Sequence, residues 1–356
     1  MSSERRVRVM IVEDSLVVRQ LLAHIVGRDP RFVLASAVAS AEEALAEIGR
    51  VKPDVISMDI RLPGIDGLEA TRRIMSEHPT PIVVIADSVE DASLRISMNA
   101  LRAGALSVVE KPVGVASSAY ERIAETITTQ LFIMSSVPVI RRRTFASAAS
   151  AAAPPQPLAR RSEFAKLSYL ALAASTGGPP ALAKVLEALP QDFPAAVFVV
   201  QHMGSAFMEG FAAWLHGLSP LPVALAEDGV AALPGRVYVA PGDRHLAIDP
   251  GGVMKLVSGP TAPTQRPSAN ILFESLARSA GSHTAGVLLT GMGEDGGQGL
   301  LELRRAGGYT IAEHQSSAVV YGMPAAAVRL KAAREILPLD AIGPRVAQLA
   351  SKRAEG

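Results

Sequence analysis

Three residues of the types used in serine hydrolysis each follow an apolar run. Ser175 comes directly after the run 167–174, His202 comes directly after 199–201, and Asp295 follows the run 284–290 through Gly-Met-Gly-Glu. Nucleophilic serine catalysis needs a hydroxyl, a base within hydrogen-bond reach and a carboxylate that orients the base. If the three runs are neighbouring strands, this spacing predicts such a constellation.

The residues after Ser175 favour a turn from a strand into a helix. Thr176 is followed by Gly177, Gly178 and Pro179. Glycine permits a tight turn, and proline suits the first turn of a helix. Free backbone N–H groups at a helix start stabilise negative charge, so this turn is a candidate oxyanion site.

The seven histidines sort by their predicted positions. In the second half of the chain only His202 and His314 follow strands directly, whereas His245 falls in a predicted hairpin and His283 precedes a strand. His202 is therefore the first candidate for the base. His314 stays as an alternative base.

Other interpretations of these segments are available. A Ser-Thr-Gly-Gly turn can be a plain loop or a phosphate cradle, and the glycine-rich stretch 291–299 can serve close backbone packing. The turn at Ser175 lacks the third glycine of a dinucleotide fingerprint and the lysine of a P-loop. A cofactor site is thus the less favoured interpretation.

Acidic residues mark strand ends in the first half of the chain. Glu13 and Asp14 follow the first predicted strand, Asp59 ends the third, and Lys111 follows the fifth. Three converging carboxylates repel one another unless a cation lies between them, and oxygen ligands suit Mg²⁺. Lys111 offers a positive charge to a phosphoryl group. Ordinary solvated loop acids are the alternative.

The elements that must position these residues alternate between strands and helices. In the first half we expect strands at 7–12, 33–38, 55–58, 82–86 and 106–109. In the second half we expect strands at 167–174, 196–201, 236–240, 284–290 and 309–313, with helices near 180–189, 207–218, 271–280 and 298–306. This alternation predicts an α/β protein with two doubly wound parallel sheets. Turn residues at 240–243 predict an added hairpin within 237–248.

Composition divides the chain and restricts its partners. The 356 residues accommodate about two domains, and an Ala-, Ser- and Pro-rich stretch around 145–158 reads as a linker. We expect domains at 1–134 and 166–356 with a linker at 135–165. The net charge of +1 favours neither nucleic acid nor an anionic membrane, and no cysteine is present for a disulfide, thiolate or nucleophile. With no signal peptide and no spanning apolar stretch, we expect a cytoplasmic protein without membrane insertion.

The first half resembles the receiver domain of two-component response regulators over residues 5–130. The resemblance is carried by the segments 12–15, 58–59, 62–67 and 110–112 (Val-Glu-Asp-Ser, Met-Asp, Leu-Pro-Gly-Ile-Asp-Gly and Glu-Lys-Pro). It implies a flavodoxin-like fold in which Asp59 accepts a phosphoryl group from a chemotaxis histidine kinase. It also implies that Glu13, Asp14 and Asp59 hold Mg²⁺ and that Lys111 contacts the phosphate.

One position departs from the receiver pattern. The fourth strand of a receiver usually ends in a Ser or Thr that moves onto the phosphorylated aspartate, but here Ala86 and then Asp87 follow Ile85. A methyl group cannot hydrogen-bond a phosphoryl oxygen. We therefore expect weaker coupling between phosphorylation and output, unless Ser88 takes the place of the missing hydroxyl.

The second half resembles the chemotaxis protein-glutamate methylesterases over about 167–350. The motifs are Ala-Ser-Thr-Gly-Gly-Pro at 174–179, Gln-His-Met at 201–203, Arg-Pro-Ser at 266–268, Leu-Thr-Gly-Met-Gly-Glu-Asp-Gly at 289–296 and Val-Tyr-Gly-Met-Pro at 320–324. The resemblance implies a Rossmann-like domain in which Ser175 is the nucleophile, His202 the base and Asp295 the orienting acid. It places Thr176 and Met292 around the site.

The resemblance also implies the substrate, which is the γ-methyl ester of glutamate on methylated chemoreceptors. Deamidation of receptor glutamines is implied as a second activity, and no cofactor is required for the esterase. Asn270 and the pair Glu313-His314 depart from the family's usual residues. A receiver-controlled, non-enzymatic binding module is the alternative, and a transcription factor is disfavoured because no basic helix-turn-helix pattern follows the receiver.

Overall fold

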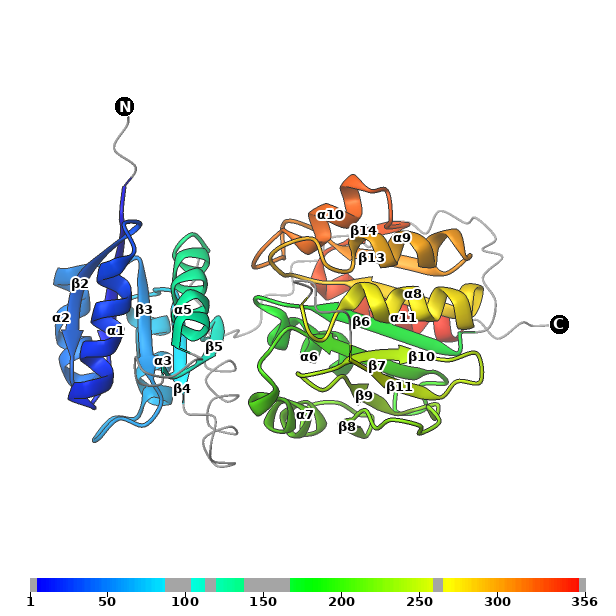
Figure 1. The fold of residues 1–356 in the computed structure, drawn as a ribbon, viewed down its shortest axis with the longest axis horizontal. Coiled ribbons are helices and arrows are strands. Elements are labelled where there is room, and N and C mark those ends of the chain that lie inside the picture. Colours follow the sequence, from blue (N-terminus) through cyan, green and yellow to red (C-terminus); the bar gives the residue numbers. More distant parts are fainter. Residues whose placement is uncertain (1–4, 87–103, 113–119, 138–166, 259–264, 352–356) are drawn as a thin grey trace, which may run out of the picture.

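Runs of buried apolar residues form two parallel sheets, each covered by helices on both faces (Figure 1). The computed structural model describes residues 5–86, 104–112, 120–137, 167–258 and 265–351. The first domain carries the N-terminal acids and the second carries Ser175, His202 and Asp295. The predicted switch positions Asp87 and Ser88 and most of the predicted linker lie outside the described residues.

The first sheet has five parallel strands in the order β2-β1-β3-β4-β5. They are β1 (Val7–Val12), β2 (Phe32–Val38), β3 (Val55–Asp59), β4 (Ile82–Ala86) and β5 (Ser107–Glu110). Every residue of β3 and β4 is buried. Strands covered on both faces read as continuous apolar runs, which is why the sequence located them to within one residue at each end.

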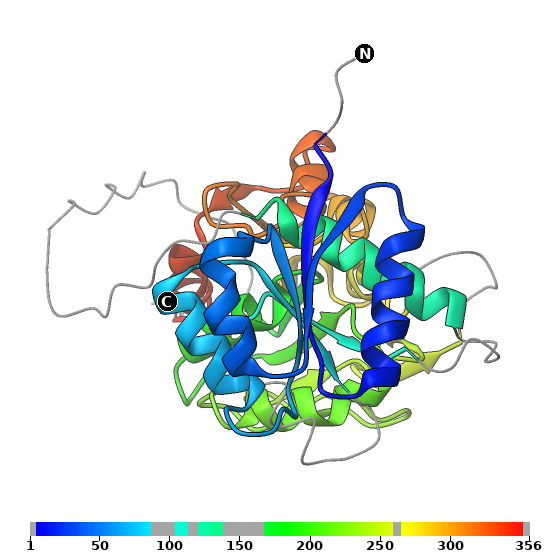
Figure 2. The ribbon, with the colours of Figure 1, turned by 90° about the vertical axis from the view of Figure 1, so that its left-hand side faces the viewer.

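The helices of the first domain are α1 (Leu16–Arg28), α2 (Ala41–Val51), α3 (Gly67–Glu77) and α5 (Tyr120–Ser135). Each of the first three begins at a capping side chain, Ser15, Ser40 or Asp66, which accepts a backbone N–H of the first turn. α1 and α5 pack on one face of the sheet and α2 and α3 on the other (Figure 2).

The second sheet has seven parallel strands in the order β14-β13-β12-β6-β7-β9-β8. They are β6 (Tyr169–Ala174), β7 (Ala196–Gln201), β8 (Val223–Leu225), β9 (Val237–Val239), β12 (Thr284–Leu288), β13 (Tyr309–Glu313) and β14 (Glu335–Leu337). The chain builds outward from β6 in one direction and later from β12 in the other. Ligand sites of doubly wound sheets lie at the carboxyl ends of the strands where this reversal occurs.

Helices cover both faces of this sheet as well. They are α6 (Gly178–Glu187), α7 (Met208–His216), α8 (Ala269–Ser279), α9 (Gly297–Arg305), α10 (Met323–Arg329) and α11 (Leu339–Ser351), with 3₁₀ turns at Ser205–Phe207 and Gly281–His283. α6, α7 and α11 bury their apolar faces with one side of β6, whereas α8, α9 and α10 pack on its other side. The four helices expected in this half are confirmed, with ends shifted by one or two residues.

The added hairpin is present, but its predicted turn was wrong. β10 (His245–Ile248) and β11 (Met254–Val257) pair antiparallel as a separate two-stranded sheet. Their turn is closed by Asp249, whose Oδ1 accepts the N–H groups of Gly251 and Val253. The segment 240–243 instead leads from the main sheet to the hairpin, because Ala240 N still bonds to Val199 O beside β9.

The sequence missed five strands and α-helices of the second domain, namely β8, β11, β14, α10 and α11. β8 and β14 have three residues each, too few to show a period. α11 contains Pro344, and α10 has Pro324 in its first turn.

Among the described residues, no helix is both long and apolar enough to cross a membrane.

Phe273 tests the packing that places α8 against the sheet. Its side chain is fully buried, and a Cβ added at Gly299 of α9 would lie 3.0 Å from Phe273 Cβ. We expect Phe273→Ala to lower the free energy of unfolding by about 3–5 kcal/mol, and Phe273→Leu by less than about 1.5 kcal/mol. Urea unfolding followed by fluorescence reports this domain alone, because Trp214 is the single tryptophan. A loss below about 1 kcal/mol for Phe273→Ala would contradict this packing.

Candidate active site

A hydrogen-bonded histidine and aspartate lie at the carboxyl edge of the second sheet. His202 follows β7, and Asp295 lies in the loop between β12 and α9. His202 Nε2 is 2.8 Å from Asp295 Oδ2, and the two side chains are 6% and 15% exposed. Residues 93 apart in the sequence therefore meet, as the strand-end argument predicted.

The Asp295 carboxylate receives further hydrogen bonds from the start of α8. Its Oδ1 accepts Ser268 Oγ–H at 2.8 Å and Asn270 N–H at 3.2 Å. Its Oδ2 accepts Ala269 N–H at 2.6 Å in addition to His202. Backbone N–H groups in a first helical turn favour an anion. Asp295 thus caps α8 from another segment of the chain.

These contacts hold Asp295 in its charged form. Burial by itself raises the pKa of the carboxyl group, but the hydrogen bond from His202 and those from Ala269 N and Ser268 outweigh it, so the pKa lies below its ordinary value. A carboxylate can only accept hydrogen bonds. His202 Nε2 must therefore carry its proton, which leaves Nδ1 as the ring nitrogen able to act as a base.

The turn that carries Ser175 is fixed by its backbone. Ser175 N donates to Thr290 O at 3.0 Å, and Gly178 N donates to Ser175 O at 2.8 Å. Gly177 has a φ of +75°, which glycine adopts without strain. Within the part of the chain that the structure describes, the N–H groups of Thr176 and Gly177 have no acceptor. They remain available as donors to a ligand.

Gln201 braces the nucleophile and the histidine together, a role that sequence reasoning did not assign. Its side chain is buried, and Nε2 donates to Ser175 O at 2.8 Å and to His202 O at 3.2 Å. A Cβ added at Gly178 would come within 2.1 Å of Gln201 Oε1, so the second glycine of the turn makes room for this brace. The Gln-His-Met motif at 201–203 includes this residue, but the motif alone does not indicate what its side chain contacts.

Glu313, a departure noted in the sequence, lies beneath the same turn. It is fully buried, Oε2 accepts Thr290 N–H at 2.8 Å, and Oε1 accepts Ser317 Oγ–H at 2.9 Å. Thr290 Oγ1 in turn donates to Thr176 O at 2.9 Å. Burial raises the pKa of the Glu313 carboxyl group, and its two hydrogen bonds only partly offset this. Glu313 therefore supports the nucleophile through Thr290.

A cleft of about 810 Å³ brings the candidate residues together with the first domain. Ser175, Thr176 and His202 line it from one side, and Glu110 and Arg122 line it from the other. Figure 1 shows β5 and α5 on the side of the first domain that is turned toward the second. Among the described residues, no hydrogen bond joins Ser175 Oγ to His202; such bonds are often long in an enzyme without substrate.

The remaining sequence candidates of the second domain are less tightly held. Met292 is 45% exposed in the loop between Gly291 and Asp295. Asn270 uses its side-chain oxygen to accept Gly299 N–H at 2.7 Å, which joins α8 to α9. His314 is exposed and its Nδ1 lies 2.8 Å from Ser316 Oγ. His202 and not His314 is therefore the histidine paired with a part-buried carboxylate.

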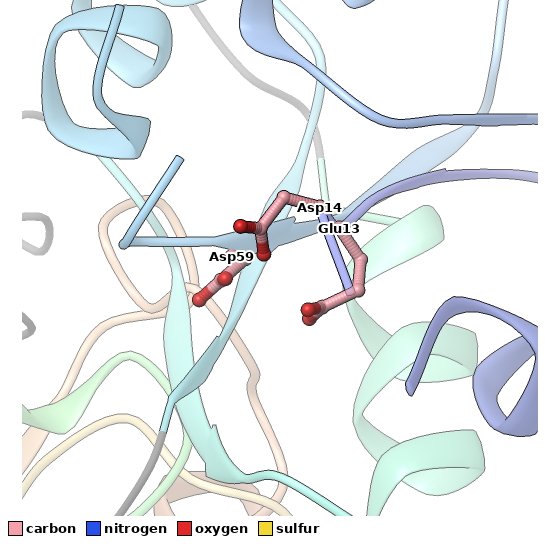
Figure 3. A group of neighbouring side chains, drawn as sticks. All are labelled: Glu13, Asp14 and Asp59. Atoms are coloured by element: carbon pink, nitrogen blue, oxygen red, sulfur yellow. The ribbon is translucent and has the colours of Figure 1, made fainter. Parts of the chain in front are cut away.

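The acids of the first domain converge as expected. Ligand oxygens of Glu13, Asp14 and Asp59 all lie within 4.8 Å of one another at the ends of β1 and β3 (Figure 3). Lys111 Nζ lies 2.9 Å from Asp59 Oδ2 and 3.2 Å from Glu13 Oε2. One lysine cannot neutralise three carboxylates. The donor set therefore fits a hard divalent cation such as Mg²⁺.

Burial and mutual repulsion perturb this acidic cluster. Burial and the neighbouring Asp59 charge raise the pKa of Glu13 to about 7. Burial also raises the pKa of Asp59, although Lys111 opposes the shift. Burial alone would lower the pKa of Lys111, but its bonds to Asp59 and Glu13 raise it above the ordinary value. Ala86 ends β4 beside these groups without offering a hydroxyl.

Comparison with known proteins agrees with both halves of the chain. Residues 170–346 match the model of the CheB methylesterase family, and residues 9–119 match the response regulator receiver domain. A protein-glutamate methylesterase/protein-glutamine glutaminase of Paramagnetospirillum magneticum is 49% identical over 97% of this chain and 98% of its own length. One of Myxococcus xanthus is 42% identical over 95% of this chain and 96% of its own.

A solved structure is similar to the second domain. The crystal structure of the Thermotoga maritima CheB methylesterase catalytic domain is 36% identical, with a TM-score of 0.50. The match covers 52% of this chain and 100% of that one.

Gly291 tests whether the loop after β12 positions Ser175. A Cβ added at Gly291 would lie 2.2 Å from Met323 Sδ and 2.8 Å from Ser175 Cβ, whereas one added at Gly293 meets nothing within 4 Å. We expect Gly291→Ala to slow labelling of Ser175 by a fluorophosphonate at least about tenfold, because small misplacements of reacting groups are costly. Gly293→Ala serves as the control, because it places an alanine at a φ of +82° but creates no close contact. Equal labelling rates in both variants would contradict this role.

Proposed function

This chain belongs to the family of protein-glutamate methylesterases/protein-glutamine glutaminases, and we propose that it hydrolyses glutamate γ-methyl esters on chemoreceptors with Ser175 as nucleophile. Phosphorylation of its receiver domain regulates this reaction. The observation that carries the assignment of residues is the part-buried His202–Asp295 pair at the strand edge where the Ser175 turn also begins. A binding module has no need of this pair beside a serine.

Acylation begins when Ser175 Oγ attacks the ester carbonyl carbon and His202 Nδ1 takes the hydroxyl proton. The C=O electron pair moves to oxygen, and the N–H groups of Thr176 and Gly177 are the candidate donors to this oxyanion. Collapse breaks the bond to methoxide, which leaves as methanol with the proton from His202. Asp295 keeps the Nε2 proton in place and stabilises the imidazolium.

Deacylation repeats these steps with water in place of serine. His202 Nδ1 takes a proton from water, the hydroxide adds to the acyl carbon, and the proton returns to Ser175 Oγ as the glutamate is released. Attack on a glutamine side chain gives the same acyl-enzyme with ammonia as the leaving group. Both activities named for the relatives thus follow from one acyl chemistry.

Regulation is proposed to act through the shared cleft. Residues of β5 and α5 face the candidate nucleophile across it, so the receiver restricts access of a receptor segment. A histidine kinase supplies the phosphoryl group to Asp59.

The end of α5 at Ser135 and the start of β6 at Tyr169 support domains at 1–134 and 166–356 with a linker between them.

Glu13, Asp14 and Asp59 would hold Mg²⁺ in the receiver. The Glu13 Oε2 atom is buried and has no hydrogen bond among the described residues, only its ion contact with Lys111. A bound cation would offset the negative charge of these acids and of an incoming phosphoryl group. Lys111 is positioned to contact that group from the end of β5.

Methanol release tests the proposed function. We expect the purified full-length protein to release methanol from methylated receptor fragments, faster after addition of a small phosphoryl donor. Ser175→Ala should lower the rate by several orders of magnitude, because the remaining groups cannot form the acyl-enzyme. Undiminished release by Ser175→Ala, or no release by the donor-treated protein, would contradict the proposal.

The raised pKa of Glu13 predicts that Mg²⁺ binding depends on pH. Below the pKa of about 7 a proton competes with the cation for this carboxylate. We expect the apparent affinity for Mg²⁺ to fall by up to about tenfold for each pH unit below 7 and to level off above it. Calorimetric titration of the full chain between pH 6 and 8 measures this, with Glu13→Gln as the control that removes the dependence. A pH-independent affinity would exclude Glu13 as a ligand.

A further inference from the structure

His245 is a buried histidine that the proposed chemistry does not use. It begins β10 and has no exposed surface. Its Nδ1 accepts the backbone N–H of Ser268 at 3.0 Å, and its Nε2 has no partner among the described residues. A ring nitrogen accepts a hydrogen bond only without a proton, so His245 is neutral with its hydrogen on Nε2.

The Ser268 that His245 holds is one hydrogen bond away from the catalytic carboxylate. Ser268 Oγ donates to Asp295 Oδ1, and the next N–H group, that of Ala269, donates to Asp295 Oδ2. Ser268 precedes α8 but makes no side-chain cap to its own helix. Its hydroxyl donates to Asp295 instead. The position of the Ser268 backbone therefore determines the direction of that hydrogen bond.

We infer that His245 is a positioning residue for Asp295, acting through Ser268. The chain of contacts runs from His245 Nδ1 to Ser268 N, from Ser268 Oγ to Asp295, and from Asp295 to His202 Nε2. It crosses from the hairpin to the main sheet. The hairpin thereby gains a function in catalysis beyond covering α8, where Ile248 N donates a hydrogen bond to Ser275 Oγ.

The surroundings of His245 keep its Nδ1 an acceptor. Burial and the nearby positive charge of Arg266 lower the pKa of His245, and the Asp295 charge offsets only part of this. If the ring were protonated, Nδ1–H would face the Ser268 N–H as donor against donor. The contact that orients Ser268 would then be lost.

A purely packing role for His245 makes a different prediction. A packing residue is replaced best by a side chain of similar size, whatever its polarity. A positioning residue is replaced best by a side chain with an acceptor at the place of Nδ1. Asparagine carries Oδ1 one bond from Cγ, as Nδ1 is, whereas the polar atoms of glutamine lie one bond further out. Asparagine and glutamine are both polar, so their comparison isolates where the acceptor lies.

The test compares His245→Asn, His245→Gln and His245→Leu in the full-length, phosphoryl-donor-treated protein. We expect His245→Asn to keep kcat for methanol release within about fivefold of the unmodified protein. His245→Gln and His245→Leu should lower kcat about 10- to 100-fold with KM changed less than about twofold, since the substrate contacts remain. The inference would be overturned if all three variants had the same kcat, or if His245→Asn and His245→Gln lost kcat by the same factor.

Two further measurements separate positioning from stability. Ile248→Val in the same strand is the packing control and should change the unfolding midpoint but not kcat. In a protein that already carries Asp295→Asn, His245→Gln should lower kcat little further, because both changes act on one carboxylate. A full additional loss of 10- to 100-fold there would show that His245 acts elsewhere.

The inference rests on the proposed function, so one readout is independent of substrate. The His202 N–H that is hydrogen-bonded to Asp295 gives a proton resonance that nuclear magnetic resonance detects without turnover. We expect this resonance to persist in His245→Asn and to shift or broaden in His245→Gln. An unchanged resonance in His245→Gln would overturn the role of His245 whether or not the protein releases methanol.

Discussion

The placement of the Asp295 carboxylate is the constraint on which the second domain's site depends. A charge that is mostly removed from water must be compensated by hydrogen bonds, and removal of one partner from such a group is expensive. Here the compensation comes from His202, from Ser268 and from the first N–H groups of α8. The loop after β12, the strand end of β7 and the start of α8 are therefore tied to one carboxylate, and none can move alone without removing part of its hydrogen bonding.

The nucleophile is positioned by a second set of contacts that hold the backbone on both sides of it. Thr290 accepts Ser175 N–H, and the buried Glu313 holds the N–H of Thr290 in turn. Gln201 joins the Ser175 carbonyl to that of His202 from the neighbouring strand. The serine and the histidine thus reach one edge because three adjacent strands, β12, β6 and β7, end there in register. The receiver faces this edge across the cleft with β5 and α5, where the proposed regulation would restrict access.

The strand ends and most of the fold were predictable because buried parallel strands are continuous apolar runs. Ser175, His202 and Asp295 could be found from residue type at those ends, and Glu13, Asp14, Asp59 and Lys111 likewise. His245 and Gln201 could not, since their roles depend on contacts that no local pattern encodes. The predicted hairpin position indicates no role for His245, yet that hairpin brings it to Ser268. The prediction of a hairpin turn at 240–243 was wrong because Ala-Pro-Gly-Asp suits any tight connection between strands.

The most direct test of this account is the rate of methanol release by Asp295→Asn in the donor-treated protein. An amide in place of the carboxylate offers an N–H toward donors, so His202 loses both its tautomer and the stabilisation of its imidazolium. We expect kcat to fall by about 10³- to 10⁴-fold with the fold retained, as in other triads. A variant that keeps kcat within tenfold of the unmodified protein would contradict the central role of Asp295.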